Sequence, residues 1–138
     1  MWILIFCMKT ETEKMIKGTG IDIVEIKRME HWLSDVKLLE RFFHAGEISY
    51  SLSKGKSAAQ SLAVRFAAKE AFGKALGTGM KNISLNDIMV YNDENGRPDI
   101  KLSGSAKKML EESGADKVHV SLSHEKENAV AMVILEEA

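Results

Sequence analysis

The stretch RFAAKEAFGKALGTG, at residues 65–79, constrains the fold more than any other, because it predicts a helix that lacks a polar face. With about 100° of rotation per residue, small side chains gather along one face of this helix. These side chains are Ala67, Ala71 and Ala75. The opposite half is bulky and apolar, with Leu62, Phe66, Phe72 and Leu76. We therefore expect the helix to be buried on two sides, with another backbone lying close to its alanine face.

The charged residues of this helix have no solvent-facing side of their own. Glu70 and Lys74 stand one turn apart on one flank, and Arg65 and Lys69 stand one turn apart on the other. Charged groups at the margin of apolar surface either extend to water or line a site. The sequence leaves both interpretations open.

Shorter helices and strands are predicted in the rest of the chain. Helical spacing of apolar residues predicts helices over 25–33, 35–43, 45–52, 57–76 and 103–113. The long helix is expected to end at Gly77, and the last helix to begin with a serine cap. Alternating patterns predict strands over 15–24, 87–92, 99–102, 117–123 and 129–135. These elements predict an α+β fold with helices packed on an antiparallel sheet.

A chain of 138 residues fits a single domain, which we expect to span residues 15–138. The opening MWILIFC is far shorter than the ~20 apolar residues that cross a bilayer. It also lacks the positive start and small-residue cleavage site of a signal peptide. Residues 1–14 are therefore predicted to be an N-terminal appendage.

The charge balance limits the possible partners. A net charge of −1 argues against bulk attraction to nucleic acid or to an anionic membrane, so we expect neither as a partner. Any electrostatic partner must then be met by a local patch. The single cysteine, Cys7, cannot form an intrachain disulfide, which excludes a zinc site built from cysteines and suits the cytoplasm.

Asp22 and Glu70 are the candidate metal ligands. Asp22 follows Gly18 and Gly20 on one face of a predicted strand, where small residues leave room for a ligand. Two carboxylates, completed by phosphate oxygens and water, suit Mg²⁺, and Lys74 could neutralise phosphate charge. The structural alternatives are a helix cap shared by Asp22 and Glu25, and an ordinary Glu70–Lys74 surface pair.

Other polar residues are less specific by themselves. His124 ends the predicted strand at SLSH, where a surface or hydrogen-bonded role is the commoner one for a lone histidine. Arg28, Lys37 and Arg41 make the early helices basic. This run is either a solvated face or a docking surface for an acidic partner.

Three blocks, taken together, resemble one enzyme family. GTGIDIVEIKR at 18–28, RFAAKEAFGKALGTG at 65–79 and SLSH at 121–124 are similar, in order and spacing, to the holo-acyl-carrier-protein synthases. These short bacterial 4′-phosphopantetheinyl transferases move the phosphopantetheine group of coenzyme A onto a serine of apo acyl carrier protein. They release adenosine 3′,5′-bisphosphate and serve fatty acid biosynthesis. The main alternative is a binding module that holds the carrier protein or a nucleotide without turnover.

The resemblance implies roles for individual residues. Asp22 and Glu70 would bind Mg²⁺ and, with Lys74, form the catalytic group, while either Glu70 or a metal-bound water takes the serine proton. The residues implied in coenzyme A binding are Lys56, Arg65, Lys74, Gly96, Arg97, Pro98 and His124. Those implied in carrier-protein docking are Arg28, Lys37 and Arg41. The resemblance also implies a cytoplasmic homotrimer with active sites at subunit interfaces.

Overall fold

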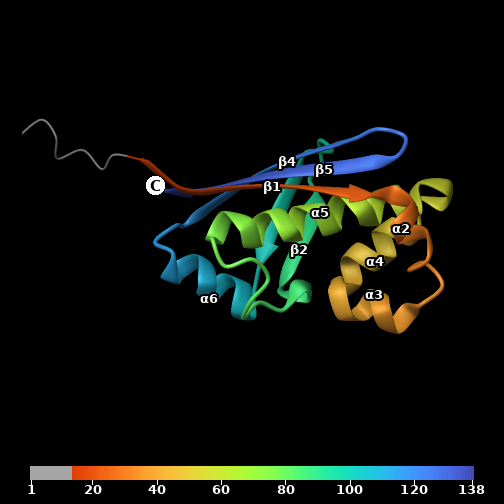
Figure 1. Cartoon of the computed structure of the whole chain (residues 1–138), viewed down its shortest axis with the longest axis horizontal. Helices are drawn as coiled ribbons and strands as arrows, with labels where there is room; N and C mark the ends of the chain where they lie inside the picture. Colours follow the sequence, from red (N-terminus) through yellow and green to blue (C-terminus); the bar gives the residue numbers. More distant parts are fainter. Residues whose placement is uncertain (1–13) are drawn as a thin grey trace, which may run out of the picture.

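Helix α5 (Ala58–Leu76) runs through the middle of the molecule, as its two apolar sides predict. The computed structural model describes residues 14–138. One side of α5 is covered by an antiparallel sheet (Figure 1). Its strands are β1 (Met15–Glu25), β5 (Asn128–Glu137) and β4 (Lys117–His124), in that spatial order.

Short helices cover much of the rest of α5. They are α2 (Ile26–Glu30), α3 (Val36–Phe42) and α4 (Ala45–Leu52), which lie together near the N-terminal part of α5 (Figure 1). The 3₁₀ turn η2 (Gly55–Ser57) leads directly into α5. The predicted helix over 25–33 is thus shorter than expected, because the chain turns after Glu30 and the next helix starts only after Asp35. The Asp35 carboxylate accepts a hydrogen bond from the Leu38 amide and so caps α3.

A hairpin forms a second, separate sheet within the described residues. It consists of β2 (Ile88–Asn92) and β3 (Pro98–Leu102), and the 3₁₀ turn η3 (Leu85–Asp87) precedes it. The α+β fold is therefore confirmed, but its strands divide between two antiparallel sheets. The hairpin packs beside α5 and against β4 without joining the larger sheet.

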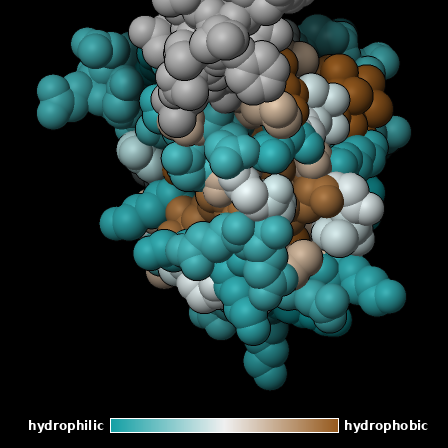
Figure 2. Space-filling model, turned by 90° about the vertical axis from the view of Figure 1, so that its left-hand side faces the viewer, coloured by the Kyte–Doolittle hydropathy of each residue, from teal (hydrophilic) through white to brown (hydrophobic). Residues whose placement is uncertain are grey.

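Helix α6 (Gly104–Glu112) closes one end of the molecule. Seen from that end, the surface is mostly hydrophilic, with smaller hydrophobic areas between the polar side chains (Figure 2). The prediction that a serine side chain caps this helix is wrong. Ser103 occupies the cap position, but its side chain makes no capping bond. The Asp87 carboxylate instead accepts hydrogen bonds from the amide and hydroxyl of Ser105, at 2.9 and 2.6 Å.

Strand β1 crosses α5 at very short range, and two glycines make this possible. A Cβ atom on Gly18 would lie 1.9 Å from the Ala75 carbonyl oxygen, and one on Gly20 would lie 2.0 Å from that of Ala71. Both distances are far below any van der Waals contact. The alanine face of α5 therefore receives the backbone of β1, as predicted, and the helix ends at Gly77 with a φ of 81°. Because side chains alternate along a strand, Asp22 points to the same side as these glycines.

The other face of the sheet carries exposed apolar side chains. Ile21 and Ile23 of β1 are 62% and 63% exposed, and Met132 of β5, which pairs with Ile21, is 43% exposed. This group, called the outer sheet face below, has no covering element among residues 14–138. None of the described helices is long and apolar enough to cross a membrane.

Candidate active site

Asp22 and Lys74 meet where β1 crosses the last turn of α5. The Lys74 ammonium lies 2.9 Å from the Asp22 carboxylate and 3.0 Å from the Ile21 carbonyl oxygen. The Asp22 side chain is 18% exposed and that of Lys74 is 52% exposed, so the pair opens to solvent on one side. The Asp22–Lys74 pair joins two segments that lie 52 residues apart in the sequence.

Glu70 lies one turn before Lys74 and belongs to the same cluster. Burial raises the pKa of the Glu70 carboxyl, and the neighbouring Asp22 carboxylate raises it further. Lys74 and Arg28 act in the opposite direction and lower this pKa. Two carboxylates thus lie close enough to repel each other where β1 crosses α5.

Both structural alternatives for these acids fail. Asp22 lies inside β1, and the cap position of α2 is occupied by Glu25, whose side chain makes no capping bond. The Lys74 ammonium pairs with Asp22, and none of the ion pairs found in residues 14–138 joins it to Glu70. The cluster of Asp22, Glu70 and Lys74 is therefore a tertiary arrangement.

The donor atoms of this cluster fit a divalent cation such as Mg²⁺. Carboxylate oxygens are its preferred protein ligands, and a cation between Asp22 and Glu70 would relieve their mutual repulsion. No group of three or more acidic, histidine or cysteine side chains with the arrangement of a metal site occurs in the described part of the chain. A metal held here would thus depend on oxygen atoms of substrate or water for the rest of its shell.

A cleft of about 380 Å³ opens at the other end of α5. Arg65 is buried in its wall, and the guanidinium donates to the Ser61 hydroxyl at 3.0 Å and to the Asn92 side-chain oxygen at 2.8 Å. The same guanidinium lies 4.5 Å from the centre of the Tyr50 ring. Its Nε atom is buried without a hydrogen-bond partner. Burial lowers the pKa of Arg65, and the nearby Glu47 carboxylate opposes this effect.

Four of the residues predicted to bind coenzyme A line this cleft, and three do not: Lys74 belongs to the acidic cluster, and Arg97 and Lys56 lie elsewhere. Arg65, Gly96, Pro98 and His124 line it together, and the His124 ring is hydrogen-bonded to the Gln60 side chain. Arg97 instead lines a neighbouring hollow on the far side of Pro98. Lys56 lies exposed in η2, outside the lining residues.

The lining also contains residues that the sequence analysis missed. They are Tyr50, Lys54, Gln60 and Asn92. Lys54 thus lines the cleft in the place expected for Lys56. The Lys54 ammonium lies 4.5 Å from the centre of the Tyr50 ring. Spacing offers a partial signal, because Tyr50 and Lys54 are four residues apart at the end of a predicted helix. Asn92 gave no signal, since its role depends on where the hairpin packs.

The basic residues predicted to dock a partner lie on α2 and α3. Arg28, Lys37 and Arg41 are all exposed. The Arg28 guanidinium lies 5.6 Å from the Phe66 ring centre, and that of Arg41 lies 5.4 Å from Phe42. The two rings are themselves 6.2 Å apart, so one aromatic cluster supports both arginines. Because Arg28 also lowers the pKa of Glu70, this basic face adjoins the acidic cluster.

The sequence analysis expected the charged residues of α5 either to extend to water or to line a site, and Lys69 does neither. Its side chain is 0% exposed, so it neither extends to water nor lines the cleft. The ammonium lies 2.6 Å from the Glu47 carboxylate, which is equally buried. Burial lowers the pKa of Lys69, while Glu47 opposes this shift.

Known proteins share this arrangement of sequence and fold. Residues 18–133 match the model of the 4′-phosphopantetheinyl transferase superfamily. A holo-[acyl-carrier-protein] synthase of Treponema denticola is 61% identical over 122 residues, which cover 88% of this chain and 99% of that protein.

Two solved structures extend the comparison. One is a holo-(acyl-carrier-protein) synthase of Bacillus anthracis in complex with CoA (3′,5′-ADP), with a TM-score of 0.75 and 42% identity. The match covers 90% of this chain and 99% of that one. The other is a holo-[acyl-carrier-protein] synthase of Helicobacter pylori in complex with coenzyme A, with a TM-score of 0.72 and 37% identity. That match covers 85% of this chain and 98% of that one.

Proposed function

The chain belongs to the 4′-phosphopantetheinyl transferase superfamily, as its motifs predicted, and from this premise we propose its reaction. It transfers the 4′-phosphopantetheine group of coenzyme A to a serine of apo acyl carrier protein. The serine oxygen forms a bond to the β-phosphorus of the pyrophosphate, and the bond from that phosphorus to the bridging oxygen breaks. Adenosine 3′,5′-bisphosphate leaves, and the proton of the serine hydroxyl passes to Glu70 or to water.

One observation carries this proposal: a single helix, α5, contributes to both parts of the site. It places Arg65 in the cleft and Glu70 and Lys74 in the acidic cluster. At a rise of 1.5 Å per residue, Arg65 and Glu70 are about 7.5 Å apart along the axis. The helix thus places the Arg65 cation and the acidic cluster about one and a half turns apart, on different flanks. Arg65 and His124 would hold the nucleotide end, while Lys74 would offset charge on the pyrophosphate.

We further propose that Asp22 and Glu70 hold Mg²⁺. When bound, the metal would neutralise charge on the pyrophosphate oxygens. The supporting observation is that β1 packs against α5 so closely that Asp22 lies beside the turn carrying Glu70 and Lys74, with its carboxylate 2.9 Å from the Lys74 ammonium. Burial, and then the Asp22 carboxylate, raise the pKa of Glu70, as expected for two neighbouring acids. Helix α5 presents Glu70, and the close contact of β1 with this helix brings Asp22 to the same region.

The mass of the carrier protein tests the reaction and its metal dependence together. Apo acyl carrier protein incubated with this protein, coenzyme A and Mg²⁺ is expected to gain one phosphopantetheine group, measured as intact mass. A chelator should abolish the gain, and renewed Mg²⁺ should restore it. An unchanged mass, with a carrier that another transferase modifies, would favour the alternative of a binding module without turnover.

Arg28, Lys37 and Arg41 are proposed to dock the acidic carrier protein. A carrier seated on this basic face would bring its serine toward Glu70, since Arg28 adjoins that carboxylate. The proposed role belongs to fatty acid biosynthesis in the cytoplasm. The single cysteine of the chain suits that reducing compartment.

Reversing the charge of Arg28 should change the KM for the carrier protein much more than the KM for coenzyme A. Arg28→Glu is expected to raise the KM for the carrier by about tenfold while the KM for coenzyme A stays within about twofold, because only the carrier meets this face. Added salt should weaken carrier use by the wild type in the same direction. Lys107→Glu, an exposed charge reversal on α6, is the control. Equal changes in both KM values would contradict the docking assignment.

The outer sheet face is proposed as the contact between subunits of a homotrimer. Its exposed Ile21 and Ile23 flank Asp22 in β1 but point to the opposite side of the sheet, so assembly through this face would place the subunit boundary across β1 from the acidic cluster. Residues 15–138 are proposed to form the transferase domain. The predicted appendage, residues 1–14, falls almost entirely outside the described residues and stays a prediction.

A further inference from the structure

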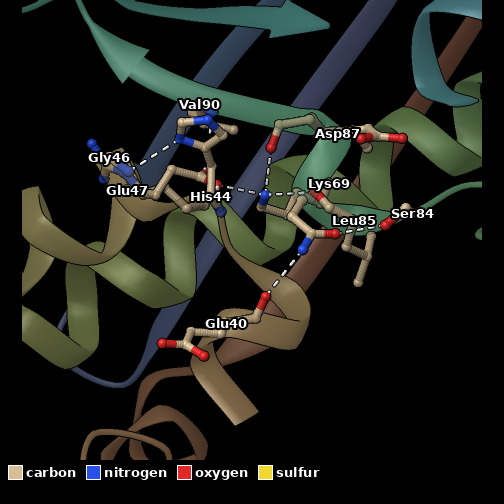
Figure 3. Close-up of polar contacts among 12 residues, drawn as sticks. Glu40, His44, Gly46, Glu47, Lys69, Ser84, Leu85, Asp87 and Val90 are labelled. Carbon is tan, nitrogen blue, oxygen red and sulfur yellow. Dashed lines mark hydrogen bonds and ion pairs between the residues drawn. The ribbon is translucent and has the colours of Figure 1, made fainter. Parts of the chain in front are cut away.

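Lys69 joins three segments at a single buried point. Its ammonium donates to the Glu47 carboxylate at 2.6 Å, to the Leu85 carbonyl at 2.8 Å and to the Ile88 carbonyl (Figure 3). An ammonium group has three N–H donors, and here each has an acceptor. Lys69 therefore ties the middle of α5 to α4, to η3 and to the first residue of β2.

Glu47 extends this connection on its own side. One carboxylate oxygen accepts from both Lys69 and the backbone amide of His44, where it completes the capping box of α4. The other oxygen accepts from the backbone amide of Val90, at 3.2 Å. A single side chain thus links the first turn of α4 directly to the middle of strand β2.

Both linked segments continue into the walls of the cleft. Helix α4 carries Tyr50, and Lys54 lies just past the end of this helix. Strand β2 ends at Asn92, which accepts a hydrogen bond from Arg65, and the hairpin then brings Pro98 to the cleft. The buried pair thus connects two segments that both continue to the lining of the cleft.

Stability alone is a poor explanation for an ion pair in this position. Removing two charges from water is costly, and well-packed apolar residues of similar volume often stabilise a protein equally well or better. A fully hydrogen-bonded pair does, however, favour one relative placement of the segments that it joins, because hydrogen bonds require a set distance and direction whereas hydrophobic attraction is non-directional. The pair thus has a geometric consequence that apolar packing would not reproduce.

We propose that Lys69 and Glu47 are positioning residues for the cleft: their buried pair sets the spacing between α4 and β2, and so the fit of the 3′,5′-bisphosphate end of coenzyme A. Neither residue touches the nucleotide. They act through Tyr50, Arg65 and Asn92. This inference rests on the proposed function of the cleft.

The double variant Lys69→Met/Glu47→Met tests whether the pair positions α4 and β2 or only stabilises the fold. Each single variant leaves a buried charge without its partner and should lower Tm, while the double variant removes both charges and should lose less than the two single variants together. Its Kd for adenosine 3′,5′-bisphosphate, measured by calorimetry, is nevertheless expected to be at least about tenfold weaker than wild type. The KM for coenzyme A should rise equally, with the KM for the carrier within about twofold. The control is Lys108→Met/Glu112→Met, which removes the exposed pair on α6 and should leave Kd unchanged.

Glu47→Gln provides a second test that keeps the volume of the side chain. If its amide oxygen serves Lys69 and His44, its NH₂ group faces the Val90 N–H, and two donors cannot bond. We expect faster hydrogen exchange at the Val90 amide together with a Kd about threefold or more weaker. This test holds even if the double variant does not fold.

The possible outcomes are distinct. A folded double variant with wild-type Kd, or a Glu47→Gln protein with faster Val90 exchange and wild-type Kd, would overturn the positioning role and leave the proposed function intact. Wild-type protein that fails to bind adenosine 3′,5′-bisphosphate would overturn the proposed function, and this inference with it. Weaker nucleotide binding in both variants, with unchanged carrier KM, supports the inference.

Discussion

Asp22→Ala and Glu70→Ala are each expected to lower turnover by about a thousandfold, the scale of losing one preorganised charge-stabilising group. Both carboxylates are proposed to hold the metal that neutralises the pyrophosphate, so neither can compensate for the other. Turnover is measured by the mass gain of apo acyl carrier protein under saturating coenzyme A and Mg²⁺.

The fold should survive both substitutions, for different reasons. The pair of Asp22 with half-exposed Lys74 is of the class that contributes only about 0.2–1 kcal/mol, so its loss should change Tm little. The raised pKa of Glu70 means that its charge is disfavoured in the folded protein. The isosteric Glu70→Gln should therefore have a Tm equal to or above that of wild type, while turnover is lost.

The effect of Mg²⁺ on Tm tests the metal assignment independently of turnover. Mg²⁺ added with coenzyme A should raise the Tm of the wild type by mass action, and this increment should vanish in Glu70→Gln. Glu112→Gln, at an exposed carboxylate of α6, is the control and should behave as wild type in both assays. Near-normal turnover in either Asp22→Ala or Glu70→Ala would refute the metal assignment.

Ile21→Asp is expected to dissociate the proposed homotrimer and, with it, most of the activity. Ile21 is 62% exposed on the outer sheet face, beside Ile23 and opposite Met132. Burying an isoleucine contributes about 1.5–3 kcal/mol, and an unpaired carboxylate in the same place is strongly unfavourable. Because three such faces would meet in one assembly, the penalty would be repeated in each subunit.

Light scattering measures the outcome against a chain mass of 15.3 kDa. The wild type is expected at about three times this mass and Ile21→Asp at the mass of one chain. Val36→Asp places the same charge on an equally exposed apolar residue of α3, away from the sheet, and should remain assembled. A wild type that runs as a single chain would show that the outer sheet face has another role. An Ile21→Asp trimer would show that the contact lies elsewhere.

Local patterns predicted most of the helices and strands because the forces behind them are local. Alternation placed the strands, and the Asn-Gly turn placed the hairpin between 92 and 98. The alanine face of α5 also predicted a close backbone contact, since only small residues permit it. The glycines of β1, which were expected to leave room for a ligand, make that contact instead. Errors arose where a distant residue replaced a local one, as when Asp87 rather than Ser103 capped α6.

The family motifs named the acidic cluster and a small part of the cleft lining. Asp22, Glu70, Lys74, Arg65 and His124 all lie in quoted blocks, so resemblance could find them. Tyr50, Lys54 and Asn92 lie outside those blocks. Their place in the cleft follows from how α4 and the hairpin pack on α5, which a linear pattern does not encode.

By itself, the sequence determined the α+β class, the central helix buried on two sides, the backbone contact at its alanine face, and the family. These depend on side-chain size and periodicity, which can be counted along the chain. Only the tertiary structure decided which charges meet: Lys74 pairs with Asp22 rather than Glu70, and Lys69 is buried against Glu47. The physical reason is that an ion pair depends on distance and burial in space, and its partners here lie 52 and 22 residues apart in the chain.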